Sequence, residues 1–281
     1  MESEIPAILN FFEVMETLEV FGKRWFYGME SGRRIHPQFP NVVDTEDCVA
    51  VRKQMNGSDV LELSTRKLDE PVTTRHWDGK DYISNYATGS IYSCDSYSYG
   101  TFSIEAVLPK GSMQHAAFWM SGDSSWPPEI DCFETYNTKR GRTLTWPDIV
   151  TQIINGYASD LLKWNGILPA RRVKPNLHWG TKDNHEYLCA FNTPFNFFDE
   201  PYACFNTYEV VWMPELIKIE YNRNLVLECR NKDILECFNK DPHMHVILSN
   251  SYVPDVQSGV KDEMPMPKTP YVIRSFTYRE L

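Results

Sequence analysis

The chain has 281 residues, with 28 Lys+Arg against 38 Asp+Glu, a formal net charge of −10 and a sequence pI near 5.2. This length is enough to bury a full core, and 42% apolar residues with 23% charged ones exclude an intrinsically disordered chain. The acidic balance argues against a nucleic-acid or anionic-membrane binder, and the sequence has no apolar run of about 18 residues that would predict a transmembrane helix.

The N-terminal segment carries few signals. Apolar residues at roughly helical spacing between residues 5 and 21 predict a short helix, within an N-terminal arm of residues 1–40 that packs on the main domain. The acidic start is not followed by an apolar stretch, so no secretory signal sequence is visible and the compartment stays open. The seven Cys residues include no CxxC pair, so we expect most of them to be buried free thiols.

Residues 41–281 are predicted to form one all-β domain. Short strands follow one another in chain order at residues 49–53, 60–64, 99–108, 115–120, 130–134, 209–212, 217–221, 225–228, 245–248 and 271–278. Asn56-Gly57 marks a hairpin turn between the first two, and residues 184–204, rich in Asn, Phe and Pro, predict a long loop. So many short strands favour a β-jelly-roll sandwich of two antiparallel sheets, with a concave substrate cleft.

The strand after Pro128 carries three carboxylates in six residues, in the string EIDCFE of residues 129–134. On a regular strand Glu129 and Asp131 share a face, whereas Glu134 would point to the other one. One extra residue in a β-bulge near Cys132 and Phe133 returns Glu134 to the same face. The spacing therefore predicts three acidic side chains in a row.

Three like charges in a row suit glycoside cleavage, in which retaining enzymes place two carboxyls roughly 5–5.5 Å apart. Crowded negative charge should raise the proton affinity of one member, as a general acid at neutral pH requires. The alternative is a solvated edge strand with scattered acids.

The surroundings of this string resemble glycoside hydrolase family sixteen. The matching segments are residues 99–111 (YGTFSIEAVLPKG), 117–120 (AFWM), 126–131 (WPPEID), 176–180 (NLHWG), 205–212 (FNTYEVVW) and 271–276 (YVIRSF). The resemblance implies a jelly roll that cleaves internal β-linkages of polysaccharides with retention, as laminarinases, agarases, porphyranases and carrageenases do. It implies Glu129 as the nucleophile, Glu134 as the acid/base and Asp131 as a residue that orients Glu129.

The same resemblance indicates three substrate-binding residues. Trp119 matches a Trp that forms the floor beside the scissile bond, where an indole face can pack on a pyranose. Trp126, in the loop before the acidic strand, is a candidate subsite wall, and His178 could donate a hydrogen bond to the substrate or to Glu134. The alternative for each is an ordinary structural residue. Gln114 and His115 replace an aromatic-Pro stretch common in laminarinases, which weakens a glucan assignment.

The prediction from sequence is thus a retaining endo-acting β-glycoside hydrolase that acts on β-1,3-glucan or a β-galactan. A non-catalytic carbohydrate-binding jelly roll and a transglycosylase are the alternatives. We expect a polysaccharide or oligosaccharide partner, itself extracellular, a monomeric protein and no required cofactor. Some family members hold a structural calcium ion, but no metal ligands can be assigned here. The basic residues 171, 172 and 174 would suit a sulfated galactan, or belong to a solvated loop.

Overall fold

Two β-sheets packed face to face make up the computed structural model, which describes residues 16–28, 42–75, 80–109, 114–135, 173–190, 201–252 and 269–281. The larger sheet has ten strands. Eight of them form one row, in the spatial order β1 (Thr17–Val20), β2 (Lys23–Tyr27), β7 (Asp81–Ser93), β16 (Met244–Tyr252), β9 (Gln114–Gly122), β10 (Glu129–Thr135), β11 (Val173–Gly180) and β12 (His185–Cys189). The other two, β3 (Val42–Asp44) and β6 (Thr65–Arg75), pair with β7. Its neighbours are antiparallel except for β3 on β7.

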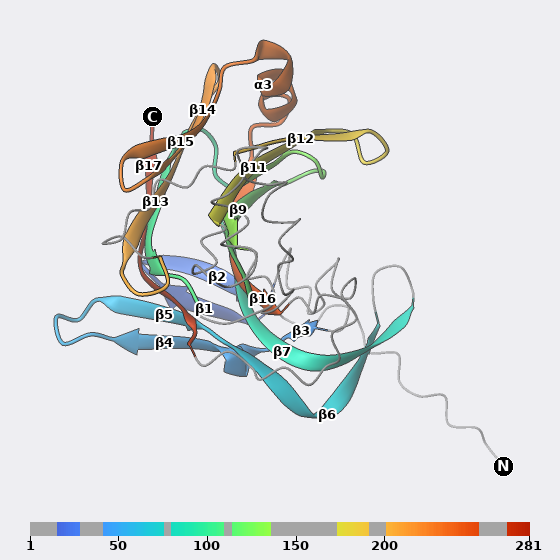
Figure 1. The fold of residues 1–281 in the computed structure, drawn as a ribbon, viewed down its shortest axis with the longest axis vertical. Coiled ribbons are helices and arrows are strands. Elements are labelled where there is room, and N and C mark those ends of the chain that lie inside the picture. Colours follow the sequence, from blue (N-terminus) through green and yellow to red (C-terminus); the bar gives the residue numbers. More distant parts are fainter. Residues whose placement is uncertain are drawn as a thin grey trace, which may run out of the picture.

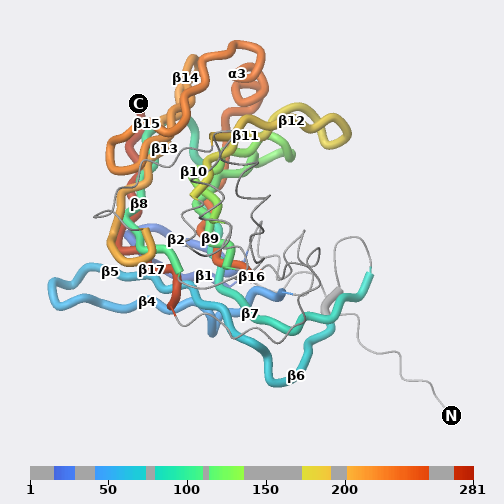
Figure 2. The backbone as a smooth tube through the Cα atoms, viewed as in Figure 1, coloured from blue at the N-terminus to red at the C-terminus, as the bar shows by residue number. Residues whose placement is uncertain are grey.

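The second sheet has seven antiparallel strands. In spatial order they are β15 (Asn224–Cys229), β14 (Leu216–Tyr221), β13 (Asn206–Met213), β8 (Gly100–Val107), β17 (Tyr271–Glu280), β5 (Asp59–Leu63) and β4 (Val49–Lys53). Figures 1 and 2 show this sheet as one layer beside the layer that contains β9, β16 and β11. The arrangement confirms the predicted all-β sandwich of two antiparallel sheets.

The core lies between the two layers and follows the alternation of the strands. Phe102, Ile104 and Ala106 of β8 are fully buried, as their period of two predicts. Ile130 and Cys132 do the same on β10 and are also fully buried. Burying these apolar side chains on the inner faces leaves the opposite face of β10 for polar groups.

Tight turns set the register of several hairpins. The β14–β15 turn places Asn222 and Arg223 at φ 49° and 65°, the left-handed conformations that a two-residue hairpin turn requires. The predicted turn at Asn56-Gly57 is present between β4 and β5, with Gly57 at φ 83°. The side-chain oxygen of Asn56 accepts a hydrogen bond from the Ser58 backbone N–H at 3.0 Å.

Two predictions about secondary structure are wrong in the described residues, and one helix was missed; residues 5–15 of the predicted N-terminal helix lie outside them. Residues 17–20 of the predicted helix form strand β1, and β12 occupies part of the predicted loop at 184–204. The α-helix α3 (Lys232–Asn239) was not expected; Asn231 caps it by accepting from the Asp233 N–H at 2.9 Å, and Leu235 and Phe238 bury its apolar face. A short 3-10 helix, η1 (Glu46–Cys48), precedes β4. Among the described residues, neither helix has the length and apolar character needed to cross a bilayer.

All seven Cys residues are free thiols, as predicted. Only Cys48, Cys132 and Cys229 are buried, so the prediction that most of them are core residues is wrong. Cys204 is exposed.

Candidate active site

Strand β10 lies between β9 and β11 in the larger sheet, and it carries the predicted bulge. Its pairing with β9 aligns Asp131 with Trp119 and then Phe133 with Phe118, which leaves Cys132 without an opposite residue. The extra residue restores Glu134 to the face of Glu129 and Asp131. The bulge predicted from the five-residue offset between the two Glu residues is therefore confirmed.

The three acidic side chains are largely withdrawn from solvent. The exposed fraction is 15% for the Glu129 side chain, 2% for Asp131 and 17% for Glu134. They occupy the face of β10 that is turned away from the second sheet, because Ile130 and Cys132 fill the core on the other face. A solvated edge strand is thus the wrong description of β10.

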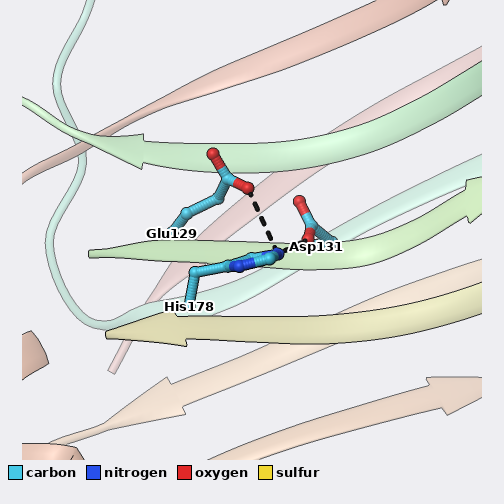
Figure 3. Close-up of side chains that lie close together, drawn as sticks. All are labelled: Glu129, Asp131 and His178. Carbon is cyan, nitrogen blue, oxygen red and sulfur yellow. Dashed lines mark hydrogen bonds and ion pairs between the residues drawn. The ribbon is translucent and has the colours of Figure 1, made fainter. Parts of the chain in front are cut away.

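His178 links two of these acids. It is the cross-strand neighbour of Glu129 on β11. Its Nε2 lies 3.1 Å from Asp131 Oδ2 and 3.5 Å from Glu129 Oε1, as Figure 3 shows. The sequence suggested the substrate or Glu134 as its partner, and the strand register places His178 opposite Glu129 rather than Glu134. Nε2 of His178 therefore lies between the carboxyl groups of Glu129 and Asp131.

Glu129 has a second donor in the loop before β10. The indole Nε1 of Trp126 donates to Glu129 Oε2 at 2.9 Å. The Trp126 side chain is part of the site, although 37% of the residue remains exposed to solvent. Trp126 and His178 thus lie beside different oxygens of Glu129, Oε2 and Oε1.

Glu134 has a different set of neighbours. The Asn176 side-chain amide donates to Glu134 Oε2, and His115 Nε2 lies 3.2 Å from Glu134 Oε1. Asn176 is buried on β11, two residues before His178, and His115 is buried on β9. The two Glu residues thus have separate neighbours, although β11 contributes one to each of them, His178 to Glu129 and Asn176 to Glu134.

Burial and mutual repulsion shift the acids in one direction. Burial raises the pKa of Glu129 well above its ordinary value, and the charges of Asp131 and Glu134 raise it further. His178 and the Trp126 hydrogen bond act in the opposite sense on Glu129. Burial, followed by the charge of Glu134, likewise raises the pKa of Asp131 well above its ordinary value. Burial thus contributes more to the raised pKa values of Glu129 and Asp131 than the neighbouring like charges do.

Aromatic rings extend from the acids over β11 and β12. His178 and His185 stack with ring centroids 4.9 Å apart, and His178 Nδ1 lies 2.7 Å from His185 Nε2. The ring of Trp126 is 5.0 Å from that of His185. Tyr187, 61% exposed, continues the row at 6.3 Å from His185. Such a row of flat faces suits the apolar side of a sugar ring.

Trp119 lies on the other side of the acids. It is aligned with Asp131 on β9, and its Nε1 donates to Ser249 Oγ at 3.2 Å. Its partly buried ring packs against Ile247 and Tyr92 on the same sheet. The structure therefore places all six residues selected from the sequence around β10, with Trp119 and Trp126 on either side of the carboxylates.

A cavity of about 560 Å³ opens beside Trp126. The loop before β10, the β11–β12 turn and the end of α3 form its walls. The residues that line it are Gly122, Ser124, Ser125, Trp126, Pro127, Pro128, Gly180, Thr181, Lys182, Cys237, Lys240 and Asp241.

Three site residues were missed or only partly identified from the sequence: Asn176, His115 and His185. Asn176 and His178 alternate on one strand, so the period of two could have selected Asn176 once 176–180 was taken as a strand. His115 was noted as a departure from laminarinases, without its contact to Glu134. His185 carries no signal in the sequence, because its place depends on the β11–β12 register. Of the basic residues at 171, 172 and 174, only Lys174 lies within the described residues, with its Nζ 5.8 Å above the Tyr187 ring.

Glu129, Asp131 and His178 also present ligand atoms within 4.8 Å of one another. Two carboxylate oxygens and one imidazole nitrogen are donors that a divalent cation accepts. These atoms already take part in the contacts described above, between His178 and the two carboxyls and between Trp126 and Glu129.

Comparison with known proteins finds no matching family model. One curated protein, the endo-1,3-1,4-β-glycanase EglC of Rhizobium meliloti (strain 1021), is 38% identical over 78 residues, which span 27% of this chain and 16% of the relative.

Solved structures match over most of the chain. Porphyranase B from Zobellia galactanivorans has a TM-score of 0.62 at 14% identity, over 94% of this chain and 88% of that one. LamAcat from the same organism has 0.61 at 14%, over 91% and 90%. A glycoside hydrolase family 16 endo-glucanase from Bacteroides ovatus has 0.57 at 19%, over 91% and 94%. The chain therefore has the jelly-roll fold of glycoside hydrolase family 16 structures.

Proposed function

We propose that this protein is an endo-acting β-glycoside hydrolase that cleaves internal β-linkages of a polysaccharide with retention of anomeric configuration. Glu129 is the nucleophile and Glu134 the general acid/base. Asp131 and His178 orient Glu129, and Trp119 and Trp126 bind sugar rings. The shared fold and the short match to a β-glycanase support this assignment.

One observation carries the proposal: the bulge in β10 brings two partly buried Glu side chains to one face, where they have different neighbours. Glu129 accepts the indole N–H of Trp126 beside His178, which favours a negative carboxylate. Glu134 lies beside Asn176 and His115. Two carboxyls with different environments are what double displacement requires, since one must be ionised while the other carries a proton.

The reaction then takes two steps. An oxygen of Glu129 attacks the anomeric carbon while Glu134 gives its proton to the glycosidic oxygen, so the C–O bond to the leaving sugar breaks as a glycosyl ester forms. Glu134, now ionised, takes a proton from a water molecule that attacks the same carbon. The ester bond breaks, Glu129 is released as a carboxylate, and two inversions give net retention.

His178 acts on the charge of Glu129 during this cycle. Its Nε2 lies between Asp131 and Glu129, at 3.1 and 3.5 Å. When Glu129 becomes an uncharged glycosyl ester, His178 Nε2 can still hydrogen-bond to Asp131. The Asp131–His178 pair thus holds the site in one geometry through both steps.

The substrate is a β-1,3-glucan or a β-galactan. Structures similar to this chain include a mixed-linkage glucanase and a porphyranase, which supports both classes. His115, next to Glu134, favours a galactan or a decorated chain over plain laminarin, whereas the buried Gln114 side chain donates to Thr65. Tyr187 and Trp126, at the exposed end of the aromatic row, offer further sugar platforms.

The test is product analysis on laminarin, mixed-linkage glucan, agarose, porphyran, carrageenan and mucin glycans. We expect a ladder of oligosaccharides from one of them, and proton NMR of the first product should show the β anomer before mutarotation. Glu129→Gln is the control for contaminating activity and should release no product. An initial α anomer, or wild-type rates in Glu129→Gln, would contradict the assignment of Glu129.

The same panel separates the alternatives. Binding to a glycan without turnover would indicate a carbohydrate-binding module rather than an enzyme. Products longer than the starting oligosaccharide would indicate transglycosylation, which shares the glycosyl–enzyme intermediate.

We also propose that the reaction needs no metal or other cofactor and that the protein acts as a monomer. Dialysis against EDTA should leave the cleavage rate within about twofold, since Trp126 and His178 already hold the carboxylates that a cation would otherwise bind. A loss of activity that Ca²⁺ restores would contradict this. Light scattering at assay concentration tests the oligomeric state.

A further inference from the structure

The bulge in β10 has an unusual neighbour on β11. On β10 two residues, Cys132 and Phe133, lie opposite one residue of β11, Pro175. The flanking pairs are Asp131 with Asn176 and Glu134 with Lys174. Proline has no backbone N–H, and in the middle of a sheet it cannot donate to the neighbouring strand. The ladder therefore has no donor on β11 for a carbonyl at this point.

A side chain from the other sheet fills this gap. The hydroxyl of Tyr221, the last residue of β14, donates to the backbone carbonyl of Cys132 at 2.7 Å in the core. Burial raises the pKa of Tyr221 well above its ordinary value, so the hydroxyl stays protonated and remains a donor at every working pH. A buried carbonyl without such a partner would be costly.

The packing around this hydrogen bond leaves the hydroxyl little freedom. Tyr208 is aligned with Tyr221 on β13, with ring centroids 5.2 Å apart. Phe133, the second residue of the bulge, packs against Tyr208 at 4.5 Å and Tyr271 at 6.1 Å. Aromatic rings of the seven-stranded sheet thus pack against the core side of the bulge.

We propose that Tyr221 is a positioning residue for the acid/base: its hydroxyl stabilises the bulge at Cys132 and so keeps Glu134 on the face of Glu129. Tyr221 touches neither acid in this role and acts through the backbone of β10. The consequence follows from the period of a strand, since a slip by one residue would turn Glu134 to the opposite face. This inference rests on the proposed function for its kinetic readout, but not for its structural one.

The kinetic test compares Tyr221→Phe with Tyr271→Phe. Both remove one hydroxyl from a fully buried ring of the same sheet, and the Tyr271 hydroxyl has no hydrogen-bond partner among the described residues. On the polysaccharide that the wild type cleaves, we expect kcat to fall about tenfold or more in Tyr221→Phe with KM within about twofold, and to stay within about twofold in Tyr271→Phe.

A second substrate separates a misplaced acid from a damaged fold. A dinitrophenyl glycoside of the released oligosaccharide has a leaving group that departs without a proton, so its glycosylation step does not need Glu134 as an acid. The burst of dinitrophenolate should be within about threefold of wild type in Tyr221→Phe. Equal losses on both substrates, or equal losses in both variants, would overturn the inference.

Replacement of Tyr221 by 4-aminophenylalanine keeps an N–H donor in place and should recover most of the polysaccharide activity. If Tyr221→Phe does not fold, this variant carries the test: it should fold and cleave, and a variant as defective as Tyr221→Phe would overturn the inference.

A crystal structure of Tyr221→Phe gives a readout that does not depend on catalysis. We expect a changed register at Cys132 and Phe133 and a displaced Glu134 carboxyl, with Tyr271→Phe unchanged. If the wild type cleaves no glycan, the proposed function fails while this structural comparison still stands. An unaltered bulge in Tyr221→Phe would overturn the positioning role itself.

Discussion

Each sheet carries acidic side chains on its outward face, and the two sheets place them in opposite environments. In the seven-stranded sheet, Glu105 of β8 receives two hydrogen bonds from Arg274 of β17, at 2.9 and 3.0 Å, and the Arg274 hydrogen bond lowers its pKa. In the ten-stranded sheet, Glu129 and Asp131 are withdrawn from solvent beside His178, and their pKa values are raised because burial outweighs the opposing effects of His178 on Glu129 and of Lys174 on Asp131.

The difference shows how one residue type serves two purposes. The Glu105 side chain is 39% exposed and is neutralised by a permanent charge, so it stays ionised and adds little beyond solubility. The acids of β10 have partners that can lose or share a proton, so their protonation state can change during a reaction. Neutral or titratable partners, rather than the number of acids, distinguish the candidate site.

The largest expected effect comes from removing the acid/base. Glu134→Ala should lower kcat on polysaccharide by about 10²–10⁴-fold, since the leaving sugar departs without a proton. Glu105→Ala, on the opposite sheet, is the control and should stay within about twofold. Steady-state rates on the substrate found by product analysis measure both. Similar rates in the two variants would remove the functional contrast between the sheets.

A smaller effect is expected from Trp126→Phe, which keeps an aromatic ring but removes the donor to Glu129 Oε2. We expect kcat to fall about tenfold, the loss of one hydrogen bond to a charged group. Because that hydrogen bond lowers the pKa of Glu129, its removal should move the acidic limb of the kcat/KM profile to higher pH.

Trp119→Phe is the matched control for this change, since its indole donates to Ser249 rather than to a carboxylate. Its acidic limb should stay where the wild type has it. A shift of equal size in both variants would show that the Trp126 hydrogen bond does not tune Glu129.

Asp131→Asn should change how the free energy of unfolding depends on pH. The folded chain binds a proton at Asp131 more tightly than the unfolded chain, whose value is near 3.8. This contribution is therefore fully present below that value and is lost as pH rises through the raised pKa. The variant has no charge to bury, so its unfolding free energy relative to wild type should rise by at least about 1 kcal/mol between pH 4 and pH 8. Urea unfolding at both pH values measures it.

Glu105→Gln should show the opposite sign and the smallest effect. Arg274 lowers the pKa of Glu105, so the stability it contributes is present above the ordinary value and is lost as pH falls through the lowered one. Because the pair is about 40% exposed, solvent screening limits the effect to about 0–1 kcal/mol. A pH dependence of the same sign in Asp131→Asn and Glu105→Gln would contradict the electrostatic contrast.

The sequence allowed the acidic strand and its bulge to be predicted, because both depend on spacing within six residues. The neighbours of Glu134 could not be predicted, since Asn176 and His115 reach it only through strand pairing across the sheet. Strand β7 shows why other elements were missed. Its last eight residues, YATGSIYS, are all buried, yet four of them in a row are small or polar, so neither a period of two nor an apolar run marks the strand.

The stacked imidazoles of His178 and His185 have a consequence for the exchange of protons with water. His178 touches buried Asp131 with one nitrogen and hydrogen-bonds exposed His185 with the other. Each ring can take up a proton on one side and release one on the other, because imidazole exists in two tautomers. A chain of two imidazoles therefore runs from buried Asp131 to the exposed ring of His185, and it offers the site a route for exchanging protons with water.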